Sequence, residues 1–252
     1  MFVEVNKLSK SYPKAGGWFR KEKLEILNEI QFSIRKGECL GLIGESGSGK
    51  STLSRIILGL DKPSKGNVKI EGLPVSRWSK CNKGKMSVVF QDYTTSVNPQ
   101  FTVRNIISEP LIILGDTKEL DDHITTLLYK VGLPLAMLDK YPHELSGGQL
   151  QRVCIARAIS TNPELVVLDE AISSLDVSVQ AQILELLLSL QQEMNMTYLF
   201  VTHDLQAVAN LCDRVLFLYH GEIVEELDSF KLFDAKNEYA KRLLDSVMPF
   251  HT

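Results

Sequence analysis

The segment GESGSGKST, residues 44–52, has glycine, lysine and hydroxyl residues at the spacing of a phosphate-binding loop. Gly44, Gly49, Lys50 and Ser51 match the fixed positions of the pattern G-x-x-x-x-G-K-[ST]. Glycines let backbone N–H groups converge on phosphates, and the helix that follows adds its positive dipole end. We therefore expect a nucleoside triphosphate here, with Lys50 bridging its β- and γ-phosphates and Ser51 ligating Mg²⁺. The expected nucleotide contacts are Gly44, Glu45, Ser46, Gly47, Ser48, Gly49, Lys50, Ser51 and Thr52.

Two adjacent acids follow a second apolar run, LVVLDE at residues 165–170. Asp169 ends a predicted strand, at the edge where a parallel sheet places its ligands, and we expect it to ligate the metal. Glu170 comes next and is expected to orient or deprotonate the attacking water. A strand that simply ends in solvated acids is the alternative, and the upstream phosphate loop disfavours it. The acids and the loop together predict hydrolysis and not binding alone.

Two more predicted strands end in polar side chains that suit the same site. Gln91 ends MSVVFQ and is expected to ligate Mg²⁺ or hold the water, with a capping role as the open alternative. His203 ends TYLFVTH, and a lone histidine there is more often structural. Its place at the same sheet edge as Asp169 favours a catalytic role. The predicted catalytic residues are Lys50, Gln91, Glu170 and His203, and the predicted metal ligands are Ser51, Gln91 and Asp169.

The elements that must position these residues follow from hydrophobic spacing. Residues 2–8 and 28–38 alternate as strands, with Ile30, Phe32 and Ile34 on one face, and residues 13–25 are expected to form a loop or extended hairpin. The runs 39–44 and 86–92 are predicted as buried strands. Leu53, Ile56, Ile57 and Leu60 have helical spacing. Strand and turn are expected at 63–72, further strands at 165–170, 197–204 and 214–226, and a long helix at 179–195.

Strands that alternate with helices predict a parallel α/β sheet. Residues 96–160 have helical patterns and no convincing strand, so we expect a helical insertion. The predicted division is a β subdomain with the first part of the core (1–95), a helical subdomain (96–160), the second part of the core (161–230) and a helical tail (231–252). A net charge of −3 lacks the general basic footprint of nucleic-acid binding.

The cysteines and the apolar runs indicate the compartment. Cys39, Cys81, Cys154 and Cys212 are widely separated, and we expect reduced thiols in the core or at the surface. The start MFVEVNKLSKSY has no apolar run of signal-peptide length, and no stretch approaches the roughly 20 apolar residues of a membrane span. We therefore expect a cytosolic protein that meets a membrane only through a partner.

The order of the motifs resembles that of ATP-binding cassette (ABC) proteins over nearly the full chain. The motifs are the phosphate loop at 44–51, Gln91, LSGGQ at 145–149, LVVLDE at 165–170, SSLD at 173–176 and VTHD at 201–204. The resemblance implies a P-loop NTPase fold: an α/β protein with a RecA-like parallel core, an antiparallel β subdomain and an inserted α-helical subdomain. It also implies ATP and Mg²⁺ as ligands.

In this family two cassettes pack head to tail, so the resemblance implies that the LSGGQ helix binds nucleotide held by the other copy. Ser146, Gly147, Gly148 and Gln149 would then be nucleotide contacts in trans, and a helix N-terminus suits that task. Further roles implied by the resemblance are adenine stacking by Tyr12, coupling of the two sites by Asp176 and a γ-phosphate contact by His203.

Within the family, YPHELSGGQLQRVCIARAI is similar to the peptide/nickel importer group, and QRVCIARA to the second ATPase of nickel-type importers. Tyr93 departs from that group, which more often has proline there. The resemblance implies an ATPase for import of nickel, another metal or a metal chelate, with di- or oligopeptide import as the alternative. A soluble ABC ATPase acting on nucleic acid or ribosomes is a further alternative, and intact Lys50, Asp169, Glu170 and His203 conflict with an inactive cassette.

The implied partners are a second ABC ATPase, two transmembrane permease subunits and, indirectly, an extracellular or periplasmic substrate-binding protein, without nucleic acid. A heterodimer of ATPases is expected and a homodimer is left open. The protein would lie on the cytoplasmic side of the membrane, held there by the permease subunits.

Overall fold

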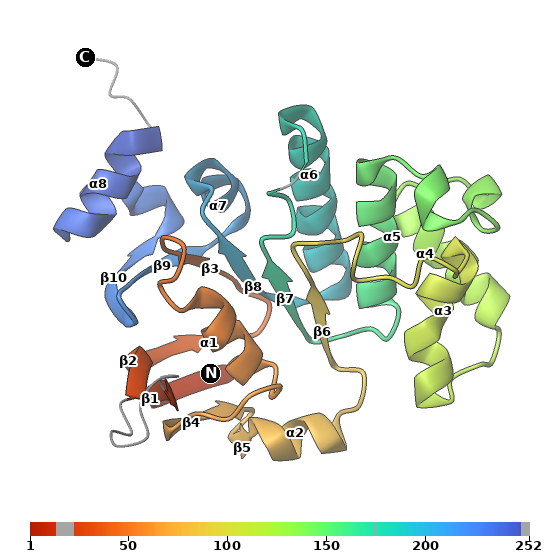
Figure 1. Cartoon of the computed structure of the whole chain (residues 1–252). Helices are drawn as coiled ribbons and strands as arrows, with labels where there is room; N and C mark the ends of the chain where they lie inside the picture. The colour runs from red at the N-terminus through yellow and green to blue at the C-terminus, as the bar shows by residue number, and fades with distance from the viewer. Residues whose placement is uncertain (14–22, 174, 248–252) are drawn as a thin grey trace. The chain divides into compact units, whose positions relative to one another are not determined.

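The computed structural model describes residues 1–13, 23–173 and 175–247. The chain divides into two compact units. Figure 1 labels their helices and strands. Unit 1 comprises Met1–Cys81 and Leu199–Thr252, and unit 2 comprises Asn82–Tyr198. Most of the predicted loop at 13–25 lies outside the described residues, although Pro13 and Lys23–Glu25 belong to strands. Ser174 of the SSLD motif also lies outside them.

Unit 1 contains an antiparallel sheet in the order β2-β1-β4-β5. Its strands are β1 (Val3–Pro13), β2 (Lys23–Ile34), β4 (Lys65–Ile70) and β5 (Leu73–Pro74), and the short helix α2 (Val75–Cys81) follows. Ile30, Phe32 and Ile34 are all buried, which confirms the predicted apolar face of β2. The indole of Trp78 is fully buried and donates to the Glu71 carboxylate at 2.9 Å.

A second set of strands has the order β10-β9-β3-β8, with β8 in unit 1 from Leu199 onward. The strands are β3 (Cys39–Ile43), β8 (Thr197–Thr202), β9 (Arg214–Tyr219) and β10 (Glu222–Asp228). β3 runs parallel to β9, and β10 runs antiparallel to β9. Every residue of β3 is buried, as its unbroken apolar run predicts. The helices of this part are α1 (Lys50–Ile57), α7 (Leu205–Leu211), η3 (Ser229–Asp234) and α8 (Glu238–Val247).

Two helix predictions in unit 1 need correction. α1 ends at Ile57, and Leu60, predicted on its apolar face, is 60% exposed. Gly59 adopts a left-handed φ of 70°, and the N–H of Leu60 turns back to the carbonyl of Arg55, which is how glycine commonly ends a helix. The helical tail is interrupted, because Ala235 to Asn237 separate η3 from α8.

Unit 2 consists of two parallel strands and a set of helices. β6 (Met86–Val89) pairs with β7 (Leu165–Asp169). The helices are α3 (Val103–Leu114), α4 (Leu120–Lys130), η1 (Leu135–Met137), η2 (Pro142–Glu144), α5 (Gly147–Ile159) and α6 (Val177–Met194). Residues 96–160, all of them described, contain no strand, as predicted. β6 is only half-buried, contrary to the prediction, because it is the last strand of its sheet.

The cysteines are free thiols, as expected. Cys39, Cys154 and Cys212 are buried, and Cys81 at the end of α2 is exposed. The sulfur atoms of Cys39 and Cys212 are 3.6 Å apart, and burial raises the pKa of Cys39 well above its usual value. Among the described helices, none combines the length and the apolar character needed to cross a bilayer.

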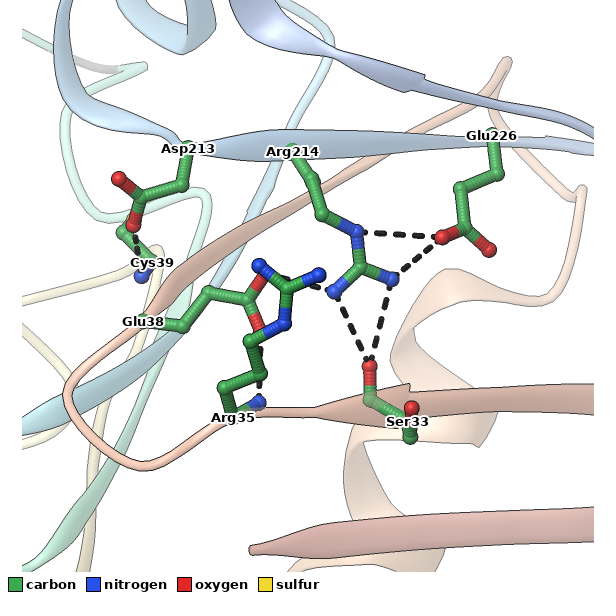
Figure 2. Close-up of polar contacts among 7 residues, drawn as sticks. All are labelled: Ser33, Arg35, Glu38, Cys39, Asp213, Arg214 and Glu226. Atoms are coloured by element: carbon green, nitrogen blue, oxygen red, sulfur yellow. Dashed lines mark hydrogen bonds and ion pairs between the residues drawn. The ribbon is translucent and has the colours of Figure 1, made fainter. Parts of the chain in front are cut away.

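A buried arginine connects the two sheets of unit 1 (Figure 2). Arg214 begins β9, and its guanidinium donates to Glu38 Oε1 at 2.6 Å and to the Glu226 carboxylate of β10 at 3.1 Å. It also reaches the carbonyl of Ser33 in β2 at 3.5 Å. Burial alone would lower the pKa of Arg214. The hydrogen bonds and charges of Glu226 and Glu38 outweigh that effect, so the net pKa is raised. The guanidinium therefore stays charged and joins three segments.

We predict that Arg214→Ala lowers the free energy of unfolding by about 3–5 kcal/mol, because it leaves the carboxylate of Glu38 buried without its cation. Denaturant unfolding of the purified chain measures the change. Lys231→Ala is the matched control, since its pair with Asp228 is exposed and its removal should change stability by less than about 0.5 kcal/mol. A loss below about 1 kcal/mol for Arg214→Ala would contradict this view of the cluster.

Candidate nucleotide-binding and hydrolysis site

The predicted phosphate loop directly follows β3 and leads into α1. Lys50 begins the helix, and its side chain is buried. Its ammonium donates to the carbonyl of Gly44 at 2.6 Å and to that of Glu45 at 3.0 Å. The loop thus wraps around its own lysine, with Glu45, Ser46 and Gly47 at the surface. This arrangement places a cation and the first turn of a helix in one loop, as phosphate binding requires.

Two glycines of the loop are required by close packing. A Cβ atom at Gly44 would lie 2.4 Å from the carbonyl oxygen of Leu218 and 2.5 Å from the hydroxyl of Ser48. Gly49 has a φ of 110°, and a Cβ there would lie 2.7 Å from the Leu27 side chain. Any larger residue would displace the backbone of the loop. The Ser48 hydroxyl is buried and has no hydrogen-bond partner among the described residues, which suits a polar ligand in this loop.

The C-terminal helix also contacts the loop. The backbone N–H of Glu45 donates to the hydroxyl of Tyr239 in α8 at 3.0 Å, and the Tyr239 ring stacks on Tyr219 at a centroid distance of 4.2 Å. Sequence reasoning missed this contact, because Tyr239 is 194 residues away and lies in a segment predicted only as a helical tail.

Tyr12, predicted to stack on adenine, lies near the end of β1 and is 38% exposed. Its hydroxyl donates to Asp61 Oδ2 at 2.6 Å, and the Lys10 ammonium lies 4.7 Å from its ring centroid. Hydrogen bonds from Lys10 and Tyr12 lower the pKa of Asp61 to about 2, and the bond to Asp61 raises the pKa of Tyr12. Neither Lys10 nor Asp61 belongs to a sequence motif, so these contacts could not be predicted from the sequence.

The predicted catalytic acid of unit 2 lies close to the predicted glutamine. Glu170 follows β7, and its Oε2 atom accepts a hydrogen bond from Gln91 Nε2 at 2.8 Å. The two strands before these residues are parallel, with Val89 opposite Leu168, so both side chains leave the same sheet edge. Glu170 has a left-handed φ of 50°, a costly conformation for a residue other than glycine, asparagine or aspartate. Asp169, the predicted metal ligand, ends β7 and is partly exposed.

The LSGGQ motif forms the start of α5. Ser146 is the N-cap, and its hydroxyl accepts from the N–H of Gln149 at 3.3 Å. The Gln149 side chain accepts in return from the N–H of Ser146 at 2.9 Å, which completes a capping box. Gln149 is a predicted nucleotide contact, and in the structure its side chain has this local capping role. Hydrogen bonds within one chain therefore fix the N-terminal end of α5.

Packing explains the adjacent glycines. A Cβ atom at Gly147 would lie 2.7 Å from the hydroxyl of Tyr93, and one at Gly148 would lie 2.7 Å from Val179. Tyr93, the residue that departs from the importer pattern, thus approaches the signature helix. Asp176 begins α6 as its N-cap, is exposed and makes no capping hydrogen bond with its side chain.

Gln151 is a residue of unit 2 that sequence reasoning missed. It is fully buried on α5, and its amide donates to the carbonyl of Ala171, next to Glu170, at 2.6 Å. The contact connects the LSGGQ helix to the segment after β7.

In unit 1, His203 follows β8 and is exposed, and Asp204 caps α7 by accepting from the N–H groups of Gln206 and Ala207.

The predicted site residues are divided between the units. Tyr12, residues 44–52 and His203 lie in unit 1, whereas Gln91, Ser146 to Gln149, Asp169, Glu170 and Asp176 lie in unit 2. No group of three or more His, Cys, Asp and Glu side chains able to hold a metal occurs among the described residues. Hydroxyl, amide and carboxylate oxygens, as in Ser51, Gln91 and Asp169, are the donors that suit Mg²⁺, which keeps waters and phosphate oxygens as further ligands.

Comparisons with known proteins agree with this chemistry. The chain is 43% identical to the metal-staphylopine import system ATP-binding protein CntF of Staphylococcus aureus strain Mu50, over 98% of this chain and 100% of that protein. It is 40% identical to the oligopeptide transport ATP-binding protein AppF of Bacillus subtilis, over 97% and 78% of the two chains. Identity to the nickel import ATP-binding protein NikE of Brucella suis is 41%, over 97% and 93%.

Solved structures show the same fold. An ATP-binding cassette solved as a dimer in a post-hydrolysis state with ADP and Pi superposes with a TM-score of 0.78 at 31% identity, covering 90% of this chain and 98% of that one. The expected P-loop NTPase fold is confirmed. A sequence model of the ABC transporter family matches residues 27–173, and with the full-length relatives this shows that the chain belongs to the ABC transporter family, as an ATP-binding cassette ATPase.

Proposed function

We propose that this ATPase powers an importer for a transition metal or a metal chelate. The observation that carries the proposal is the 43% identity to the metal-staphylopine import protein over that protein's whole length. The nickel import relative supports the same cargo class. Import of di- or oligopeptides is the second candidate, because the oligopeptide relative is 40% identical, although the chain spans 78% of it. Because these relatives are import or transport proteins, a role on nucleic acid or ribosomes is disfavoured.

The residues of the site have separate tasks in ATP hydrolysis. Lys50 and the N–H groups of the loop bind the phosphates, and their positive charge stabilises negative charge that develops as the bond breaks. Glu170 accepts from Gln91 with one carboxylate oxygen, and the carboxylate is held in place to orient water or to take its proton. Ser51, Asp169 and Gln91 would hold Mg²⁺, which neutralises phosphate charge when bound. His203 would contact the γ-phosphate.

A second ABC ATPase is the proposed partner for the LSGGQ helix. The N-terminus of α5 is exposed at Ser146, and its capping box leaves the first N–H groups of the helix in a fixed arrangement. Such an end binds anions, so it suits the phosphates of a nucleotide held by the other subunit. Asp176 would couple the two sites. We expect a heterodimer with a related cassette, with a homodimer as the alternative.

An apolar hollow in unit 2 is the proposed contact for a permease subunit. It has a volume of about 460 Å³ and is lined by residues of β6, α3 and α5 and by Phe90, the residue before Gln91. Ile113 is 76% exposed and Phe90 42%. Exposed apolar side chains gathered around one hollow are typical of interaction sites. Two permease subunits would hold the ATPase pair on the cytoplasmic side of the membrane, and a substrate-binding protein would deliver the cargo.

We predict that Lys50→Ala reduces ATP hydrolysis by on the order of 10²-fold or more, because the phosphate loop loses its buried cation. Phosphate release by the purified protein with its partner subunits measures the effect. Lys118→Ala, on an exposed segment, is the control and should keep its full rate. Near-normal hydrolysis by Lys50→Ala would contradict the assignment of the site.

Glu170→Gln should bind ATP but accumulate as a closed ATPase dimer, because the amide cannot accept the proton of the attacking water. Size-exclusion chromatography with ATP and each candidate ATPase partner detects the dimer. Glu185→Gln on the exposed side of α6 is the matched control and should not accumulate it. A monomer under every combination would count against the paired mechanism.

The cargo is tested in cells. Cells that lack the gene, grown with a chelator that limits metals, should contain less nickel, cobalt or zinc by mass spectrometry. Wild-type protein should restore the metal content and the Lys50→Ala variant should not. Unchanged metal content together with lost uptake of short peptides would replace the metal proposal by the peptide candidate.

A further inference from the structure

Tyr12 is held at two points by residues that no motif includes. Its hydroxyl donates to Asp61 Oδ2 at 2.6 Å, while Lys10 donates to Asp61 Oδ1 at 2.7 Å and lies over one face of the ring. Lys10 also donates to the carbonyl of Lys62 at 2.7 Å and is 9% exposed. The proposed adenine stack would then use the opposite face of the ring.

Asp61 is in turn fixed to the helix that follows the phosphate loop. The N–H groups of Leu60 and Asp61 both donate to the carbonyl of Arg55 in α1, at 2.9 and 3.2 Å. The Asp61 carboxylate also accepts from the N–H of Lys62 at 2.7 Å. The carboxylate that holds Tyr12 is therefore one short turn away from the helix that begins with Lys50.

The segment after α1 is also fastened to β1, the strand that carries Tyr12. The N–H of Ser64 donates to the carbonyl of Ser9 at 2.8 Å, and the N–H of Ser11 donates to the hydroxyl of Ser64 at 3.1 Å. The strand that carries Tyr12 is thus connected directly to the segment that follows α1.

We propose that Asp61 is a positioning residue that holds the Tyr12 ring at a set distance from the phosphate loop, so that base and phosphates bind together. The proposal rests on the proposed stacking of Tyr12 on adenine. Without Asp61 the exposed Tyr12 ring would become ordered only when nucleotide binds, and the entropy lost in that ordering would lower the affinity for nucleotide. With Asp61 the ring is ordered before nucleotide arrives, while the phosphate contacts are the same in either case.

The test compares a ligand that has a base with one that has none. Dissociation constants for MgADP and for magnesium pyrophosphate are measured calorimetrically on the full chain. Asp61→Ala should weaken MgADP binding on the order of three- to tenfold and leave pyrophosphate binding unchanged. Tyr12→Phe, which keeps the ring and loses the hydroxyl, should weaken MgADP binding to a similar extent. The double variant should be no weaker than either single one, because both remove the same hydrogen bond.

Two further variants complete the test. Asp61→Asn keeps an oxygen that can accept from Tyr12, so it should retain more affinity for MgADP than Asp61→Ala. Asp116→Ala, at an exposed aspartate, is the matched control and should bind both ligands as the wild type does. Melting temperatures show which variants remain folded, and Tyr12→Phe tests the hydrogen bond even if Asp61→Ala does not fold.

The outcomes separate this inference from the proposed function. If Tyr12→Ala weakens MgADP binding but Asp61→Ala and Tyr12→Phe do not, the stacking stands and the positioning role of Asp61 is wrong. If Tyr12→Ala leaves MgADP binding unchanged, the stacking assignment fails and this inference fails with it. If Asp61→Ala weakens pyrophosphate and MgADP equally, Asp61 supports the loop in general, and the positioning of the base is overturned.

Discussion

Close backbone packing around residues 44–49 is the constraint on which the phosphate-binding part of unit 1 depends. Leu218 of β9 leaves no room for a side chain at Gly44, and Leu27 of β2 leaves none at Gly49. The turn between β9 and β10 adds a third restraint, since the N–H of Gly221 donates to the carbonyl of Ser48 at 3.2 Å. The loop therefore takes its shape from two strands and a turn around it as well as from its own glycines. The antiparallel sheet therefore contributes to the shape of the phosphate loop through Leu27 of its strand β2.

Both candidate anion sites of the chain are ordered by local hydrogen bonds. In unit 1, Lys50 is held by the carbonyls of Gly44 and Glu45, and in unit 2 the capping box of Ser146 and Gln149 holds the start of α5. Groups ordered on folding need not be ordered again on binding, which favours binding of phosphate.

Hydrophobic spacing and motifs predicted the order of elements, because these signals are local in sequence. Gln91 and Glu170 were expected at one sheet edge, and parallel pairing of β6 and β7 accounts for their contact. The prediction of Leu60 as helical was wrong because the glycine before it ends α1. The prediction of β6 as buried was wrong because an apolar run cannot show that a strand lies at the end of a sheet. Asp61, Gln151 and Tyr239 were missed because each acts through a contact distant in sequence, which periodicity does not encode.

The distribution of the four cysteines has a practical consequence for spectroscopy. Cys39, Cys154 and Cys212 are enclosed by the protein, and burial raises the pKa values of Cys39 and Cys154, so these two thiols stay protonated and react slowly with maleimides. Cys81 is exposed at the end of α2. A fluorophore or spin label therefore has one accessible attachment point in the native sequence, so unit 1 can be labelled at a single site without replacing any residue.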